Sequence, residues 1–191
     1  MAFPKRTITN LIFLQKPVSY NYMDVLLVMN PQNSFLDKTG SVYMGEKAEI
    51  LKIRLADYLK SFSRPKIFFR ELHRTEDSFF SADKTHSIST TNDSLVEESL
   101  KKYANVFMDK TRYSAVYETQ LDNQLKQYGA KKIGIVGVET HTSVLFTAEK
   151  LRNMNYDVTV IEPCTMSRDD YLHGYAITLL EHYLGVKISN E

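Results

Sequence analysis

At 191 residues, the chain has the length of one domain with a full hydrophobic core, and its 43% hydrophobic and 25% charged residues are those of an ordinary globular protein. A formal net charge of +1 argues against a nucleic-acid-binding protein, and the longest apolar run is far shorter than the ~20 residues of a membrane-spanning helix. The single cysteine, Cys164, excludes an internal disulfide and a thiolate-rich zinc site, so we expect a reducing, cytoplasmic location.

The first part of the chain differs in composition from the rest. Its first 23 residues contain no acidic side chain but include Lys5, Arg6 and Lys16, which is compatible with an organelle-targeting segment. We favour an N-terminal arm, residues 1–22, that packs through its apolar residues on the domain of residues 23–191 or on a neighbouring subunit. Together with 12 tyrosines, a residue type common at interfaces, this arm predicts a homo-oligomer, a dimer or larger.

In the first half of the chain, an apolar run over 25–29 is typical of a central parallel strand that is buried on both faces. Apolar residues near helical spacing, Ile50 and Ile53 among them, predict a helix over 46–62, and a second strand follows over 66–70. Residues 72–94 are polar with no sustained period, and a loop of that length in a compact domain is often functional.

In the second half, strands and helices continue to alternate. We expect strands over 106–108, 157–161 and 186–188, and helices over 95–103, around 121–128 and through 176–183. This order predicts an α/β fold, a three-layer sandwich with a parallel sheet of about six strands.

The stretch over 134–148 predicts a strand, a turn at Gly137 and a helix whose first turn carries Ser143. Such a turn places a side chain at the carboxyl edge of a parallel sheet, where backbone N–H groups at the helix start bind anions. Asn30 and Lys110 follow two other strands and are expected at the same edge. Each alone has a simpler interpretation: a helix cap for the serine, a turn former for the asparagine and a solvated surface group for the lysine.

Taken together and in order, four segments resemble motifs of the isochorismatase-like (cysteine hydrolase) superfamily, which includes nicotinamidases, N-carbamoylsarcosine amidases and isochorismatases. They are Leu26–Leu36, Lys110–Ala115, Gly137–Ala148 and Thr165–Arg168. The resemblance covers nearly everything from residue 23 to residue 188. It implies a catalytic triad at Asn30, Lys110 and Ser143, where active amidases of the family carry Asp, Lys and Cys. It also implies a cis peptide bond at Val138–Glu139 and backbone N–H groups aimed into an oxyanion hole there.

These two replacements predict that the Asp–Lys–Cys chemistry is impaired. An amide cannot accept a proton as a carboxylate does, and a neutral serine is a poor nucleophile without a base. Isochorismatases lack the cysteine but use the aspartate as a general acid, a role equally unsuited to Asn30. We therefore expect a small carboxylate- or amide-containing ligand in a pocket at the carboxyl edge of the sheet, with Glu139, Thr140 and Thr142 as substrate- and oxyanion-binding residues.

A metal site is a further hypothesis. Glu71, His73 and Asp77 follow the second strand, where nicotinamidases keep a metal site that starts with Asp-x-His, and this donor set suits zinc or manganese. The simpler interpretation is a polar loop with a hydrogen-bonded histidine. No other cofactor is expected.

Other functions stay open at this point. One is an active amidohydrolase that uses Ser143, with Glu139 or His141 as the base, or Lys110 with a metal-bound water. Another is an oligomeric scaffold or interaction protein. Ser143 is also the replacement used to trap acyl intermediates of cysteine enzymes, although trapping rarely needs a second change such as Asn30.

Overall fold

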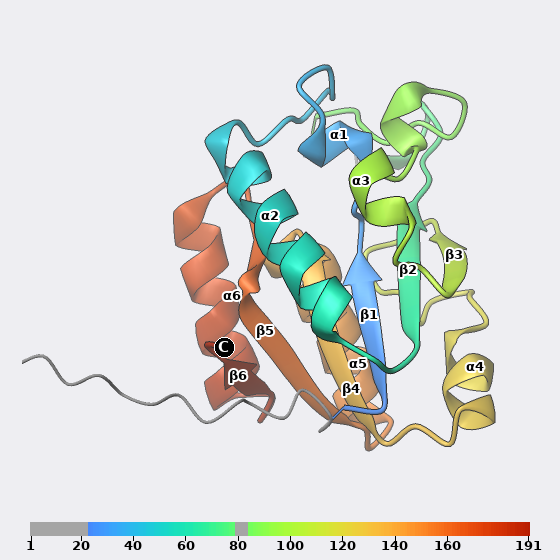
Figure 1. Cartoon of the computed structure of the whole chain (residues 1–191), viewed down its shortest axis with the longest axis vertical. Helices are drawn as coiled ribbons and strands as arrows, with labels where there is room; N and C mark the ends of the chain where they lie inside the picture. Colours follow the sequence, from blue (N-terminus) through green and yellow to red (C-terminus); the bar gives the residue numbers. More distant parts are fainter. Residues whose placement is uncertain (1–22, 79–83) are drawn as a thin grey trace, which may run out of the picture.

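The computed structural model of the protein describes residues 23–78 and 84–191, so the expected arm of residues 1–22 lies outside the described residues. The predicted α/β fold is confirmed: six strands form one all-parallel sheet in the order β3-β2-β1-β4-β5-β6 (Figure 1). The strands are β1 (Val25–Met29), β2 (Lys66–Glu71), β3 (Val106–Lys110), β4 (Lys132–Val138), β5 (Asp157–Met166) and β6 (Lys187–Ser189).

The connections between the strands contain the helices. They contain α1 (Asn33–Leu36), α2 (Glu46–Ser61), η3 (Asn92–Ser94), α3 (Glu98–Lys101), α4 (Leu121–Gln127), the π-helical turn η4 (Thr140–Val144), α5 (Leu145–Asn153) and α6 (Asp170–His182). Within the described ranges, every helix is too short or too polar to cross a membrane.

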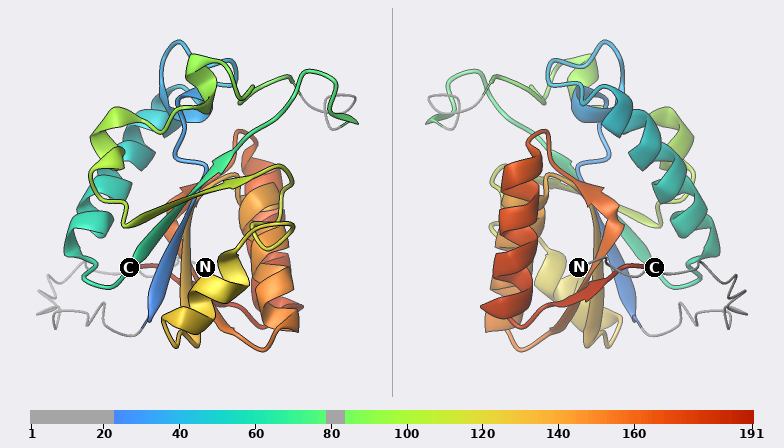
Figure 2. Two further views of the ribbon diagram at one scale, coloured as in Figure 1. Left: turned by 90° about the vertical axis from the view of Figure 1, so that its right-hand side faces the viewer. Right: turned by 90° about the vertical axis from the view of Figure 1, so that its left-hand side faces the viewer.

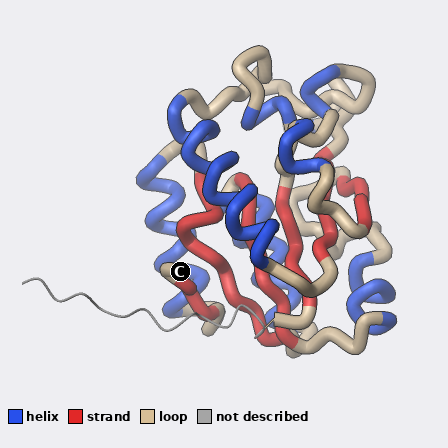
Figure 3. The backbone as a smooth tube through the Cα atoms, in the orientation of Figure 1, coloured by secondary structure: helices blue, strands red, loops and turns tan. Residues whose placement is uncertain are grey.

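Helices cover both faces of the sheet, which gives the predicted three layers (Figures 2 and 3). Strand β1 shows why, because all five of its residues are fully buried. Leu26 and Val28 face the core beneath α2, whereas Val25, Leu27 and Met29 face the core beneath α4, α5 and α6. Alternate side chains of a strand point to opposite faces, so a central parallel strand that is apolar throughout needs a helical layer on each side.

The expected elements differ from the structure in detail. The helix predicted over 46–62 is present as α2, and its buried face is formed by Leu51, Leu55 and Leu59, whereas Ile50 and Ile53 are 45% and 66% exposed. Residues 33–36 form a short helix, and β5 runs five residues beyond the expected end at residue 161.

Gly137 allows the turn after β4 to lie against the end of β1. Its φ of +107° is in the region that favours glycine, and it pairs with Met29 in the sheet. A Cβ at this position would lie 2.1 Å from the backbone oxygen of Met29. The close approach of the two backbones brings η4 next to Asn30.

Replacing Gly137 with alanine is therefore expected to destabilise the fold by about 3 kcal/mol or more, since both the positive φ and the backbone clash oppose a side chain. The matched control is Gly174→Ala in α6, where a Cβ meets nothing within 4 Å, and a gain of about 0.5–1 kcal/mol is expected. Urea unfolding of both variants checks this, and equal effects would contradict it.

Candidate active site

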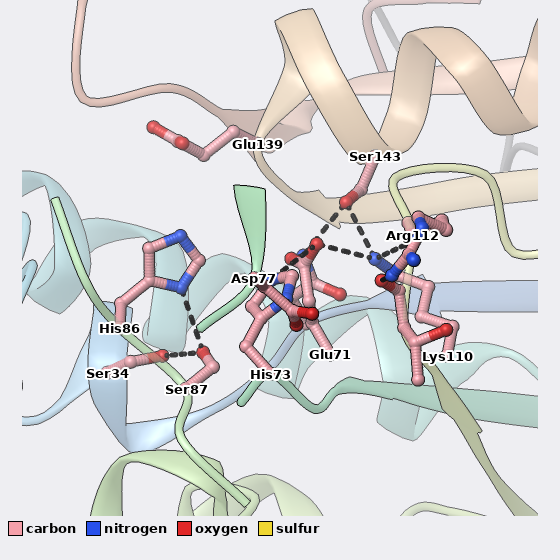
Figure 4. Close-up of polar contacts among 12 residues, drawn as sticks. Ser34, Glu71, His73, Asp77, His86, Ser87, Lys110, Arg112, Glu139 and Ser143 are labelled. Carbon is pink, nitrogen blue, oxygen red and sulfur yellow. Dashed lines mark hydrogen bonds and ion pairs between the residues drawn. The ribbon is translucent and has the colours of Figure 1, made fainter. Parts of the chain in front are cut away.

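Four polar side chains meet where the central strands end, and Figure 4 labels three of them, Glu71, Lys110 and Ser143. Asn30 follows β1, Glu71 ends β2, Lys110 ends β3, and Ser143 lies in η4 after β4. They are buried, with exposed fractions between 0% and 2%. Since β3, β2, β1 and β4 are neighbours in that order, parallel pairing brings their carboxyl ends to one edge.

The structure brings Asn30, Lys110 and Ser143 into direct contact, as the resemblance implied for the triad positions. Asn30 Nδ2 and Lys110 Nζ each donate a hydrogen bond of 3.0 Å to Ser143 Oγ. Asn30 has a φ of +46°, in a region that asparagine tolerates better than most residues. In the described structure, the serine oxygen is thus the acceptor in both of these hydrogen bonds.

Glu71 is the fourth member of this network, and the sequence analysis assigned it to a different site. Its Oε2 accepts a 2.7 Å hydrogen bond from Asn30 Nδ2, and its Oε1 lies 3.2 Å from Lys110 Nζ. Burial alone would raise the pKa of the Glu71 carboxyl group, but the positive charges of Lys110 and His73 outweigh burial and lower the pKa to about 2. A carboxylate is therefore present in the site although position 30 is an amide. The register of β2 and β3 places this carboxylate in the site, because it pairs Glu71 with Lys110.

Two opposing effects act on the pKa of Lys110. Burial lowers the pKa of its ammonium group, while the Glu71 carboxylate acts in the other direction. Its Nζ donates to the backbone oxygen of Arg112 at 3.0 Å, in addition to its contacts with Ser143 and Glu71. The positive charge of Lys110 is thus partly balanced by an internal carboxylate.

The metal-site hypothesis does not fit the geometry. His73 lies between the two carboxylates: its Nε2 is 3.3 Å from Glu71 and its Nδ1 is 3.3 Å from Asp77. A histidine that uses its two ring nitrogens in different directions does not let all three side chains converge on one ion. In residues 23–78 and 84–191, no group of three His, Cys, Asp or Glu side chains is placed to hold a metal ion.

The three residues expected to bind substrate or an oxyanion lie beside Ser143. The peptide bond between Val138 and Glu139 is cis, as predicted. The Glu139 carboxylate accepts three hydrogen bonds of 2.9 Å from the backbone and guanidinium of Arg168. Thr140 Oγ1 is 2.9 Å from His173 Nδ1, and Thr142 is half-buried. Glu139 therefore secures the loop to the chain after β5, a contact that the sequence analysis missed.

The two residues considered as a base for Ser143, His141 and Glu139, are bonded to other side chains. His141 Nδ1 lies 2.9 Å from Ser167 Oγ, and Glu139 is paired with Arg168, so neither expected base has a described hydrogen bond to Ser143.

Cys164 is buried, and burial raises the pKa of its thiol to about 12, which is typical of a structural rather than a reactive cysteine.

A cavity of about 340 Å³ adjoins the serine loop. It is lined by Tyr113, Glu139, His141, Thr142, Arg168, Asp169 and Leu172. A larger cavity of about 690 Å³ lies near α1, α3 and β3. None of the four network residues lines either cavity, but the smaller one is lined by Glu139, His141 and Thr142, which lie in the segment that carries Ser143. Ligands of parallel α/β sheets bind beyond the carboxyl ends of the strands, and the smaller cavity adjoins the loop that carries Ser143 at that edge. We therefore assign the smaller cavity to the site.

Comparison with known proteins agrees with this geometry. A family model described as isochorismatase domain matches residues 24–191. An uncharacterized isochorismatase family protein of Bacillus subtilis (strain 168), YaaI, is 33% identical over 88 residues, which are 46% of this chain and 49% of that protein. The match thus spans about half the length of that relative. A second isochorismatase family protein of the same organism, PncA, is 23% identical over 178 residues, 86% of this chain and 97% of that protein.

Solved structures share the fold at low identity. Nicotinamidase/pyrazinamidase PncA from Bacillus subtilis superposes with a TM-score of 0.78 at 22% identity, over 87% of this chain and 98% of that chain. N-carbamoylsarcosine amidase from Thermoplasma acidophilum gives a TM-score of 0.74 at 20% identity, over 87% and 96% of the two chains. These similarities establish the fold alone.

The stability of the protein is expected to depend on the charge of Glu71. Because the pKa of Glu71 is lowered from 4.5 to about 2, its ionised form stabilises the fold fully above the unfolded value, and this contribution is lost as pH falls toward 2. The free energy of unfolding of Glu71→Gln should be about 3 kcal/mol below wild type at pH 6, and the difference should shrink between pH 4.5 and 2. Chemical denaturation at several pH values measures this, with exposed Glu181→Gln as the control. A difference that is independent of pH would contradict it.

Proposed function

Because this chain belongs to the isochorismatase domain family, we propose that it binds a small molecule with a carboxylate or amide group at the carboxyl edge of the sheet, and that the Asp–Lys–Cys chemistry of the family's amidases is impaired. It is thus a hydrolase homologue whose site is retained as a binding pocket. The single buried cysteine supports a cytoplasmic location for this function.

The hydrogen bonding of Ser143 carries the proposal. Its oxygen accepts from Asn30 and from Lys110, so its own proton remains available for a ligand. A carboxylate or an amide carbonyl is an acceptor of the required kind. The adjoining cavity of about 340 Å³ has the size of a pocket for a small metabolite.

The same contacts argue against thiol-type chemistry. Position 143 supplies a hydroxyl, whose proton leaves only if a base accepts it. Asn30 is turned with its Nδ2 toward the hydroxyl and offers it a donor. Glu71 is engaged with Asn30 and Lys110. None of these contacts removes the serine proton.

One observation favours an active hydrolase as the second candidate. Lys110 Nζ is 3.0 Å from Ser143 Oγ, and burial lowers the pKa of this lysine, which makes its neutral amine a more accessible base. In that case Ser143 attacks the carbonyl of an amide after it transfers its proton to Lys110. The metal-bound water considered from the sequence has no comparable support, because Glu71, His73 and Asp77 do not converge.

A panel of small carboxylates and primary amides, nicotinamide and nicotinate among them, together with isochorismate, separates the candidates. We expect the backbone NMR resonances of residues 139–144 to shift with one or more members, and Ser143→Ala to weaken that binding about tenfold through loss of one hydrogen bond. We expect no ammonia release from the amides and no cleavage of isochorismate.

The matched control is Ser61→Ala, a serine at the far end of α2 that bonds only to its own helix. A panel that leaves residues 139–144 unperturbed contradicts the binding proposal. Ammonia release by the wild type that both Ser143→Ala and Lys110→Met abolish establishes the second candidate instead.

We also propose that the protein is a homo-oligomer. Helix α6 presents Tyr171 and Tyr175, 78% and 55% exposed, with their rings stacked at 6.5 Å, and Tyr183 at its end is 81% exposed. Exposed aromatic side chains that cluster on one helix are typical of an interface. Light scattering should give a multiple of the chain mass that Tyr171→Ser with Tyr175→Ser reduces, and comparison with a chain lacking residues 1–22 tests the arm. The mass of a single chain for the wild type contradicts the proposal.

A further inference from the structure

Glu71 is the carboxylate on which the candidate site is built. Strand β2 lies between β1 and β3, so a side chain at its carboxyl end is placed to reach both neighbouring strand ends (Figure 1). Glu71 does so: one carboxylate oxygen is 2.7 Å from Asn30 Nδ2, and the other is 3.2 Å from Lys110 Nζ. At 2% exposure it is shielded from solvent.

We propose that Glu71 supplies the negative charge that position 30 lacks, and that it is a positioning residue which makes Asn30 and Lys110 both hydrogen-bond donors to Ser143. Glu71 acts in the site of the proposed function, where it sets the direction of the hydrogen bonds to Ser143.

The orientation of the Asn30 amide follows from this carboxylate. If the amide were turned over, its Oδ1 would face Glu71 Oε2 at about the same distance, and two acceptors would repel each other. With Nδ2 toward Glu71, one amide hydrogen bonds to the carboxylate and the other to Ser143 Oγ at 3.0 Å. Asn30 Oδ1 is then left without a partner among the described residues, a cost that the charged hydrogen bond offsets.

The contacts of Lys110 lead to the same direction. Lys110 Nζ donates hydrogen bonds to Ser143 Oγ and to the Arg112 carbonyl, and it forms an ion pair with Glu71 Oε1 at 3.2 Å. A buried ammonium is stable only with a counter-charge, and Glu71 is the carboxylate in contact with it. While Glu71 is ionised, Lys110 therefore remains a donor to the serine.

This role also bears on the metal hypothesis for Glu71. The carboxylate that was expected to bind an ion is directed at Asn30 and Lys110, and its Oε1 additionally lies 3.3 Å from His73 Nε2. A carboxylate at position 30 as well would place two negative charges at hydrogen-bond distance beside one ammonium. Residues 30 and 71 are thus expected to tolerate one carboxylate between them.

A charge exchange between these two positions tests the inference. Three variants of the full chain are compared with wild type by chemical denaturation at pH 7: Glu71→Gln, Asn30→Asp, and the two together. Each substitution preserves the shape of the side chain, changes its charge by one and exchanges an acceptor oxygen for an NH2 donor or the reverse. We expect each single variant to lower the folding equilibrium constant by about a hundredfold or more, and the double variant to return to within about tenfold of wild type.

The control is Glu181→Gln, an exposed carboxylate in α6, for which a change below about twofold is expected. Single-variant effects that simply multiply in the double variant overturn the inference, as does a Glu71→Gln variant as stable as wild type. If a single variant fails to fold, the double variant decides: folded protein supports the inference and unfolded protein overturns it. Because no ligand is involved, recovery in the double variant stands even if the ligand panel fails.

Discussion

Parallel pairing around β1 is the constraint on which the rest of the molecule depends. It turns β1 into a strand that is buried on both faces, and so requires a helical layer on each side of the sheet. It also aligns the carboxyl ends of four neighbouring strands at one edge. Gly137 completes the arrangement, because only a residue without a Cβ lets the turn after β4 approach Met29 so closely. Asn30, Glu71, Lys110 and Ser143 meet as a consequence of this backbone geometry.

Charge then decides what these side chains do. The site contains one buried carboxylate and one buried ammonium in contact, and burial of either alone would cost several kcal/mol. The Glu71–Lys110 pair is neutral. Asn30, which donates to Glu71, and Lys110 also each donate a hydrogen bond to the Ser143 hydroxyl. An arrangement of donors around an oxygen suits ligand binding or stabilisation of negative charge, whereas removal of the serine proton requires a group that accepts it.

The loop that carries Ser143 is held independently of this network. Arg168 binds the Glu139 carboxylate through both its backbone and its guanidinium group, and His173 contacts Thr140. These partners come from the segment after β5 and from α6, so the two sides of the adjoining cavity are tied together by polar contacts. The fold therefore fixes this loop through polar contacts that do not involve Asn30, Glu71 or Lys110.

The sequence alone determined the fold class, the family and three of the four network residues. Apolar runs and their alternation with helices depend on local patterns, and the motifs at Asn30, Lys110 and Ser143 are local too. The role of Glu71 was decided only by the tertiary structure. Read along the chain, Glu71 belongs with His73 and suggests a metal; across the sheet, its pairing with Lys110 and its place beside Asn30 turn it toward the serine. Periodicity predicted helix α2, but the sheet on which the helix packs decided that Ile50 and Ile53 are exposed. Contacts between strands distant in sequence are set by register, which no local pattern specifies.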